Sequence, residues 1–240
     1  ERIWVSWGHS GQYGTDFLVP GMAVEIVDNH TLEAYARRIV AKVERFNKEY
    51  SAVTFTEPLP ENIRPGHLIA ADEPGPDVHI SGCRMSGNRA RGLLIGSRGR
   101  VIIENNYFHI AGASILFEGD GNFWFEQSGV RDVTIRNNIF ANGNYGSRGW
   151  GSACIAVGSG ISQRQTSRYH RNIQVDGNLF RVFDPRIVNL YCVDGFQFSA
   201  SNRIVRTSDY PATFDPKLHF VFDQCDHIEI PRQIEMAEQR

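Results

Sequence analysis

The sequence lacks several features that would assign a protein to a broad class. It has no run of about 18 apolar residues, so no membrane-spanning helix is predicted, and no signal peptide is visible. Its 25 Lys and Arg against 27 Asp and Glu give a net charge of -2, which argues against a nucleic-acid partner. The four cysteines are far apart, and no CxxC or HxH spacing indicates a disulfide framework or a metal site.

One pattern of apolar residues recurs along the middle of the chain. Its copies are Val101-x-Ile103-x-x-Asn106-x-Phe108, Val133-x-Ile135-x-x-Asn138-x-Phe140 and Ile173-x-Val175-x-x-Asn178-x-Phe180, with a weaker one at Val78-x-Ile80-x-x-Cys83-x-Met85. Apolar residues at alternate positions predict a strand with one buried face. A strand and a turn repeated every few tens of residues are typical of a stacked solenoid. The sequence therefore predicts an all-β fold, a right-handed parallel β-helix.

The repeat also predicts how the chain is divided. Copies are separated by 23, 32 and 40 residues, so the additions are expected in loops, and a second strand is expected in each unit. We expect 1–74 to be a small β-barrel-like accessory insertion, 75–230 the β-helix, and 231–240 a frayed polar tail. Residues 35–46 fit a helix or a strand, and a long strand is favoured. The repeat decays after Tyr191. Because the chain opens on a strand-like run, we expect it to be a portion of a longer protein.

The three recurring asparagines have a structural interpretation. Asn106, Asn138 and Asn178 stand where each strand ends. Their amides are expected to stack as a ladder and to bond backbone groups of neighbouring coils.

The densest polar cluster, Glu118-Gly-Asp-Gly-Asn-Phe-Trp-Phe-Glu126, follows a second strand. Glu118 and Asp120 are expected to point outward about 6.6 Å apart, near the low end of the roughly 6.5 to 9.5 Å used by inverting glycosidases. Trp124 and Asn122 would bind a sugar, and Glu126 is a third carboxylate. Alternatively, the cluster is a solvated turn or a partial calcium loop.

Two further segments are expected to lie on the same side of the predicted helix. Arg89, Arg91 and Arg98 would bind sugar hydroxyls or, alternatively, pair with nearby carboxylates. Asn144, Tyr145 and Trp150 begin the longest insertion. Asn144 would contact the substrate, and the two aromatic rings are either sugar platforms or packing within the loop.

These residues resemble those of a known family. The stretches Asn88-Arg-Ala-Arg-Gly-Leu-Leu and Glu118-Gly-Asp-Gly-Asn-Phe-Trp-Phe-Glu, within roughly 70–200, resemble the β-helix α-1,3-galactosidases of glycoside hydrolase family 110. The Pro- and Gly-rich part of 1–74 is similar to the β-barrel inserted in that family. Members of the family are much longer than 240 residues.

The resemblance implies a secreted or periplasmic, inverting exo-hydrolase that removes terminal α-1,3-linked galactose from glycans without a metal or other cofactor. It places acid and base roles on Asp120 and Glu118, with Glu126 in reserve. A polysaccharide lyase is an alternative, since such enzymes also use β-helices. A non-catalytic glycan-binding or structural β-solenoid is a third interpretation.

Overall fold

The computed structural model describes residues 2–6, 15–47, 49–73, 75–119, 121, 125, 129–163, 167–211, 219–232, 234 and 236–238. The chain forms two compact units. The first holds the described residues of 1–74, 120–126 and 160–167, and the second holds the described remainder. No described helix is long and apolar enough to cross a membrane.

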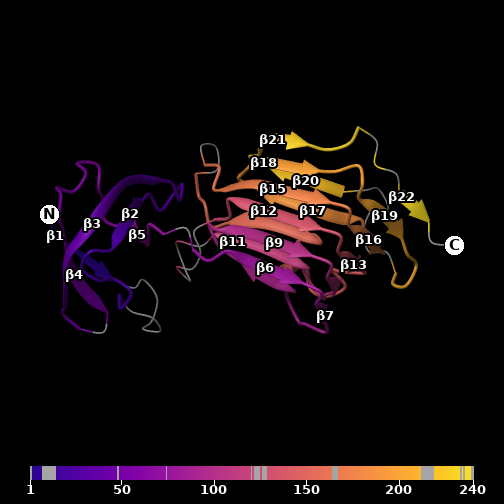
Figure 1. Cartoon of the computed structure of the whole chain (residues 1–240), viewed down its shortest axis with the longest axis horizontal. Coiled ribbons are helices and arrows are strands. Elements are labelled where there is room, and N and C mark those ends of the chain that lie inside the picture. Colours follow the sequence, from indigo (N-terminus) through magenta and orange to yellow (C-terminus); the bar gives the residue numbers. More distant parts are fainter. Residues whose placement is uncertain are drawn as a thin grey trace. The chain divides into compact units, whose positions relative to one another are not determined.

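The first unit is a five-stranded antiparallel sheet in the order β1-β4-β3-β2-β5 (Figure 1). Its strands are β1 (Arg2–Ser6), β2 (Ala23–Val27), β3 (Ala34–Arg45), β4 (Tyr50–Phe55) and β5 (Leu68–Ala71). Strand β3 confirms the prediction of a long strand over 35–46. It pairs with both β2 and β4, with register irregularities in each pairing, and such irregularities bend strands. Val24, Val40 and Val53 are buried in the core of this unit.

The second unit consists of three parallel sheets, and the chain visits them in turn. The first sheet contains β6 (Val78–Ser81), β9 (Arg100–Glu104), β12 (Asp132–Arg136), β15 (His170–Asp176), β18 (Val193–Phe198) and β21 (Asp226–Glu229). The second contains β7 (Arg84–Ser86), β10 (Tyr107–His109), β13 (Ile139–Ala141), β16 (Leu179–Val182), β19 (Arg203–Arg206) and β22 (Met236–Glu238). The third contains β8 (Leu93–Ile95), β11 (Ile115–Gly119), β14 (Ile155–Ser159), β17 (Arg186–Tyr191) and β20 (His219–Asp223). One short 3-10 helix, η1 (Arg148–Trp150), is described.

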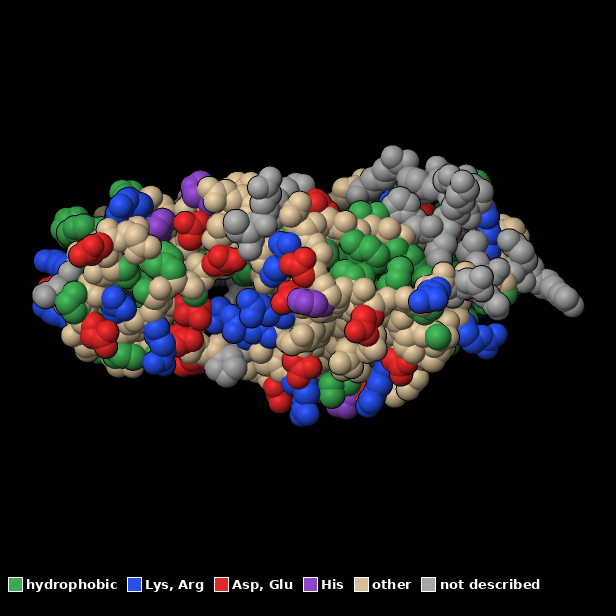
Figure 2. Space-filling view, turned by 90° about the horizontal axis from the view of Figure 1, so that it is seen from above, with side chains coloured by type: hydrophobic (Ala, Val, Ile, Leu, Met, Phe, Trp, Pro, Cys, Tyr) green, Lys and Arg blue, Asp and Glu red, His purple; other side chains and the backbone are tan. Residues whose placement is uncertain are grey.

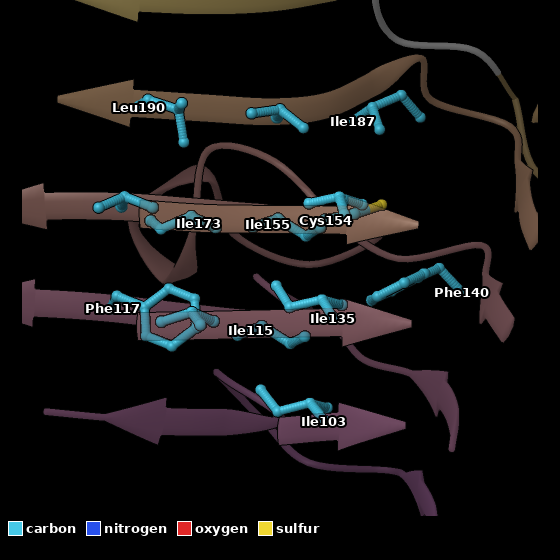
Figure 3. Packing of buried hydrophobic residues seen from close by; sticks show 14 of the residues in the cluster. Ile103, Ile115, Phe117, Ile135, Phe140, Cys154, Ile155, Ile173, Ile187 and Leu190 are labelled. Carbon is cyan, nitrogen blue, oxygen red and sulfur yellow. The ribbon is translucent and has the colours of Figure 1, made fainter. Parts of the chain in front are cut away.

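This topology is compatible with a parallel β-helix. Each strand pairs with the strand three places later, so the strands of the first sheet follow one another up Figure 1 from β6 to β21. The predicted repeat is confirmed residue by residue, because Val133 pairs with Val101 on one side and with Ile173 on the other. These side chains are buried and stack inside the sheets, as Figure 3 shows for Ile103, Ile135 and Ile173.

Each circuit holds three strands, and not the two expected from the sequence. The strand that was not expected belongs to the second sheet. It is short, and the apolar residue that ends the repeat lies on it. Phe108 stacks on Phe140 at 5.1 Å and Phe140 on Phe180 at 4.7 Å between ring centroids. All three rings are fully buried, so they form a continuous aromatic column along the stack.

The predicted asparagine ladder is confirmed. The backbone N–H of Asn106 donates to Oδ1 of Asn138 at 2.9 Å, and the N–H of Asn138 donates to Oδ1 of Asn178 at 2.9 Å. Asn202, which the sequence pattern did not indicate, continues the ladder by accepting from the Asn178 N–H at 2.9 Å. Each amide therefore serves the backbone of the preceding coil.

The stack continues beyond the point at which the repeat decays in the sequence. Strands β18 to β21 follow Tyr191, and within the expected polar tail Met236–Glu238 forms β22, paired in register with β19. In the last strands Phe220, Phe222 and Ile228 are only partly buried against the core. Figure 2 views the molecule from the top of Figure 1, where β21 lies, and shows hydrophobic side chains exposed there.

Candidate functional site

A cleft of about 220 Å³ lies on the outer face of the third sheet, the sheet of β11 and β14. Residues that line it include Arg91, Leu116, Glu118, Gly151, Ser152 and Gly158. The cleft thus combines one carboxylate, one guanidinium and a hydroxyl with small residues. It is smaller than the 300 to 1,000 Å³ typical of sites for drug-sized ligands, which suits a single sugar ring.

The alternation of β11 places Glu118 in this cleft. Ile115 and Phe117 are fully buried inside the stack, whereas Leu116 packs against Ala156 on the outer face. Glu118 follows on that outer face and is half-buried, as the sequence predicts. Its carboxylate makes no ion pair or hydrogen bond within the described part of the chain.

Arg91 lies in the same cleft, as predicted from the position of its segment one coil earlier. Its Nε is buried and has no hydrogen-bond partner among the described residues. This atom is closed to solvent, whereas the side chain as a whole is half-buried and lines the cleft, and a guanidinium carries five N–H donors. The alternative was ordinary pairing with Glu104, Glu118 or Asp120. Glu104 instead binds Arg136 at 2.6 Å and His79 at 2.8 Å, and Glu118 makes no ion pair within the described residues. Asp120 lies outside the described residues, so pairing with it stays untested.

Gly158 creates the space beside Glu118. The two residues pair directly across β11 and β14. A Cβ placed on Gly158 would meet no atom within 4 Å, so the fold itself leaves room for a side chain there. Sequence reasoning did not find Gly158, because its position beside Glu118 depends on the register between coils.

Four predicted site residues lie outside the described residues: Asp120, Asn122, Trp124 and Glu126. Arg98 is half-buried between β8 and β9 and is not among the residues that line the cleft. No group of three or more His, Cys, Asp or Glu side chains that could hold a metal is found in the described part of the chain.

Asn144 requires a correction. It is buried, its backbone N–H donates to the Ile110 carbonyl at 3.1 Å, and its φ is +62°. Its side-chain nitrogen lies 3.9 Å from Sγ of the buried Cys154. Asn tolerates this left-handed conformation, so its role here is to shape the turn, and it does not reach a ligand from solvent.

Trp150 packs within its loop, which was one of the two predicted roles. Its carbonyl accepts from the Ala113 N–H at 3.2 Å, and the Arg89 guanidinium lies 5.8 Å from the ring centroid. A Cβ on Gly146 would come within 2.9 Å of the ring, so the ring rests on that backbone. The adjacent Gly149 and Gly151, and not the indole, line the cleft.

Tyr145 belongs to an exposed aromatic cluster. Its ring stacks on His109 at 4.9 Å and on Tyr210 at 5.8 Å, and both tyrosines are 37% exposed. The ring centroids of Phe183 and Tyr210 lie 5.1 Å apart. These partners could not be predicted, because Tyr210 lies far along the chain and outside the repeat.

His170 supports the floor of the cleft from inside. Its Nε2 donates to the Gly158 carbonyl at 2.8 Å, and its Nδ1 accepts from the Val130 N–H at 3.3 Å. Burial lowers the pKa of His170 to about 4, against about 6.5 for an ordinary imidazole. The neutral ring therefore holds both bonds at neutral pH.

We expect this histidine to make the fold sensitive to acid. Between about pH 6.5 and pH 4 the unfolded chain binds a proton that the folded chain does not, so stability falls as the pH falls. The loss reaches ~2 kcal/mol at pH 5. Urea unfolding at pH 7.5 and pH 5 measures it. His170→Gln should lose this part of the pH dependence, and an unchanged pH dependence in that variant would contradict the assignment.

The comparisons with known proteins point to one group. Residues 2–69 match the family described as GLAA-B beta-barrel domain II. Alpha-1,3-galactosidase A of Shewanella woodyi is 38% identical over 204 residues, which are 85% of this chain and 33% of that protein. Alpha-1,3-galactosidase B of Bacteroides thetaiotaomicron is 33% identical over 219 residues, 90% of this chain and 35% of that protein. Alpha-1,3-galactosidase B of Akkermansia muciniphila is 28% identical over 225 residues, 92% of this chain and 28% of that protein.

The chain therefore spans about one third of the length of these curated relatives. The match extends over most of this chain, through the first unit and the parallel sheets alike. The resemblance drawn from its motifs is confirmed: this chain is similar in sequence to the α-1,3-galactosidases A and B.

Proposed function

We propose that this chain is part of a glycoside hydrolase that removes terminal α-1,3-linked galactose from glycans with inversion. The observation that carries the proposal is the half-buried Glu118, which makes no bond within the described chain and shares one small cleft with the half-buried Arg91. The similarity to proteins named α-1,3-galactosidase supports the same substrate class. A cleft sized for one sugar fits removal of a terminal residue.

The proposed reaction needs two carboxyl groups with different protonation. The acid donates its proton to the glycosidic oxygen as the bond from that oxygen to the anomeric carbon breaks. The base takes a proton from a water that attacks the anomeric carbon from the opposite face. We assign these roles to Asp120 and Glu118, with Glu126 in reserve, and no metal takes part. Arg91 donates to the sugar and orients it.

The proposal extends to the architecture around the cleft. We propose that the coils wind as a right-handed solenoid, which is the hand that parallel crossover connections nearly always take. Residues 1–74 would be an accessory region of the enzyme. An extracellular or periplasmic location is proposed from the resemblance to the β-helix α-1,3-galactosidases.

Replacing either carboxylate tests the mechanism. Asp120→Asn and Glu118→Gln should each lower kcat/KM for an α-1,3-galactoside by about 100-fold or more, since positioned acids and bases contribute about 10² to 10⁴. Galactose release is measured together with its anomeric form by proton NMR. Inversion gives β-galactose first.

Two further variants locate the reaction. Gly158→Leu should block the cleft and raise KM, because a Cβ at this position meets no atom within 4 Å and the side chain beyond it enters the space beside Glu118. Asp132→Asn removes an exposed carboxylate on another sheet and should leave turnover unchanged. Full turnover in Asp120→Asn would remove Asp120 from the mechanism. α-Galactose as the first product, or full turnover in Glu118→Gln, would contradict the proposal.

A further inference from the structure

A second and larger groove lies on a different sheet from the cleft. Its volume is about 570 Å³, against about 220 Å³ for the cleft beside Glu118. It lies on the outer face of the first sheet, towards the ends of β12, β15, β18 and β21. Its polar lining residues include Thr134, Arg136, Gln174, Asp176, Gln197 and Glu229.

The floor of this groove is a row of polar side chains, one from each coil. Thr134 pairs with Gln174, Gln174 with Gln197, and Gln197 with Glu229. Neighbouring strands are about 4.8 Å apart, so a ligand lying across the strands meets a hydrogen-bonding group at each such step. A linear polymer with a short, regular repeat fits this spacing.

The two glutamines are available to a ligand. Both side chains are exposed, and the side-chain amide of Gln174 has no hydrogen-bond partner within the described part of the chain. Gln197 makes one long bond, from Nε2 to Oε2 of Glu229 at 3.3 Å. An amide offers donors and an acceptor together, as neighbouring sugar hydroxyls require.

The charges of the groove disfavour an acidic ligand. Arg136 is already paired with Glu104 at 2.6 Å. Asp176 accepts the Ser201 hydroxyl at 2.6 Å, and bonds from Ser201 and Ser199 hold its pKa below the ordinary value. Together with Glu229, the lining carries one positive and two negative groups. Ile230, 41% exposed, adds an apolar surface for the C–H groups of a sugar.

The floor of the groove offers side chains rather than backbone to a ligand. Strands β12, β15 and β18 are paired on both sides, so their backbones offer no free edge. Strand addition needs such an edge, and among the described strands under the groove only β21, the last of the sheet, is paired on one side. Recognition over Gln174 and Gln197 therefore rests on side chains.

We infer that this groove is a second glycan-binding site, which takes a neutral, linear oligosaccharide lying across the strands. It is separate from the cleft beside Glu118, since it lies on another sheet and shares no lining residue with it. It would hold the glycan chain without cleaving it.

Calorimetric titration with two hexasaccharides tests the inference. The neutral probe is a poly-N-acetyllactosamine hexasaccharide, which lacks terminal α-1,3-linked galactose and so does not report on hydrolysis. The acidic probe is hexagalacturonate. The unaltered chain should bind the neutral probe more tightly than the acidic one. Gln174→Ala/Gln197→Ala should bind the neutral probe at least tenfold more weakly, since several hydrogen bonds are lost.

Gln163→Ala is the matched control, because it removes an exposed glutamine that does not line the groove. Its Kd should equal that of the unaltered chain. Both variants change only exposed side chains, and a thermal unfolding curve for each verifies that it is folded. The inference is overturned if the unaltered chain does not bind the neutral probe, if it prefers hexagalacturonate, or if the double variant keeps its affinity. Galactose release, measured separately, reports on the proposed function alone.

Discussion

Replacing Arg186 by Met is expected to destabilise the second unit by about 3 to 5 kcal/mol. Arg186 binds the carboxylate of Asp184 through Nε at 2.9 and 3.0 Å and through a terminal nitrogen at 2.7 Å. The Asp184 side chain is 0% exposed, and that of Arg186 is 14% exposed. The substitution leaves a buried negative charge without its partner, which is far more costly than the loss of a surface pair. Urea unfolding followed by circular dichroism measures the change.

Two companion variants separate charge burial from lost packing. Arg100→Met breaks an exposed pair with Asp77 in the same unit and should cost less than about 1 kcal/mol. Asp184→Asn/Arg186→Met removes both charges and should recover most of the loss, because two matched groups replaced together cost little. If Arg186→Met lowered the free energy of unfolding as little as Arg100→Met does, the Asp184–Arg186 pair would be accessible to water, which would contradict the burial seen in the structure.

The strands that could be predicted are those whose pattern is local. In β9 the apolar residues Val101 and Ile103 alternate with other positions, and the same alternation reappears in β12 and β15. The register of these three strands could therefore be predicted from the sequence alone. Strand β10 (Tyr107–His109) has only three residues, too few to show an alternation, and the strand that each circuit contributes to the second sheet was missed for that reason.

The ladder position of the late coil could not be recognised in the sequence, because the turn of that coil differs in length. Asn178 follows Val175 by three residues, whereas Asn202 follows Phe198 by four. Yet Val175 and Phe198 are paired across β15 and β18, and Asn202 still takes the ladder position. The extra residue is accommodated in the turn, so the physical register is kept where the sequence pattern is broken.

The candidate site likewise contains some features that could be predicted from local sequence and others that could not. The outward direction of Glu118 follows from alternation with Ile115 and Phe117, and it was predicted. The placement of Gly158 beside Glu118 depends on how many residues the intervening loops hold, which no periodicity encodes. Asn144 was misassigned because an exposed polar loop and a buried turn have the same composition, and only the contact with Ile110 distinguishes them.

The second large prediction concerns the asparagine ladder. Replacing Asn138 by Ala should lower the free energy of unfolding by roughly 3 to 6 kcal/mol, because several buried groups lose their hydrogen-bond partners at a cost of about 1 to 3 kcal/mol each. Oδ1 of Asn138 accepts from the backbone N–H of Asn106 at 2.9 Å, and Nδ2 donates to the Ile103 carbonyl at 2.9 Å. Asn138 is 1% exposed, so water cannot replace these bonds.

The position of an asparagine along the ladder should decide how much its replacement lowers the free energy of unfolding. Asn202 makes the equivalent bonds, donating to the Val175 carbonyl at 2.8 Å and accepting from Asn178, but it is only half-buried. Asn202→Ala should therefore cost distinctly less than Asn138→Ala in the same urea titration. Equal losses at the two positions would mean that the amides act through local turn geometry. A larger loss at Asn138 means that the buried bonds between coils hold the stack in register, and the cleft beside Glu118 depends on that register because Gly158 and Glu118 belong to different coils.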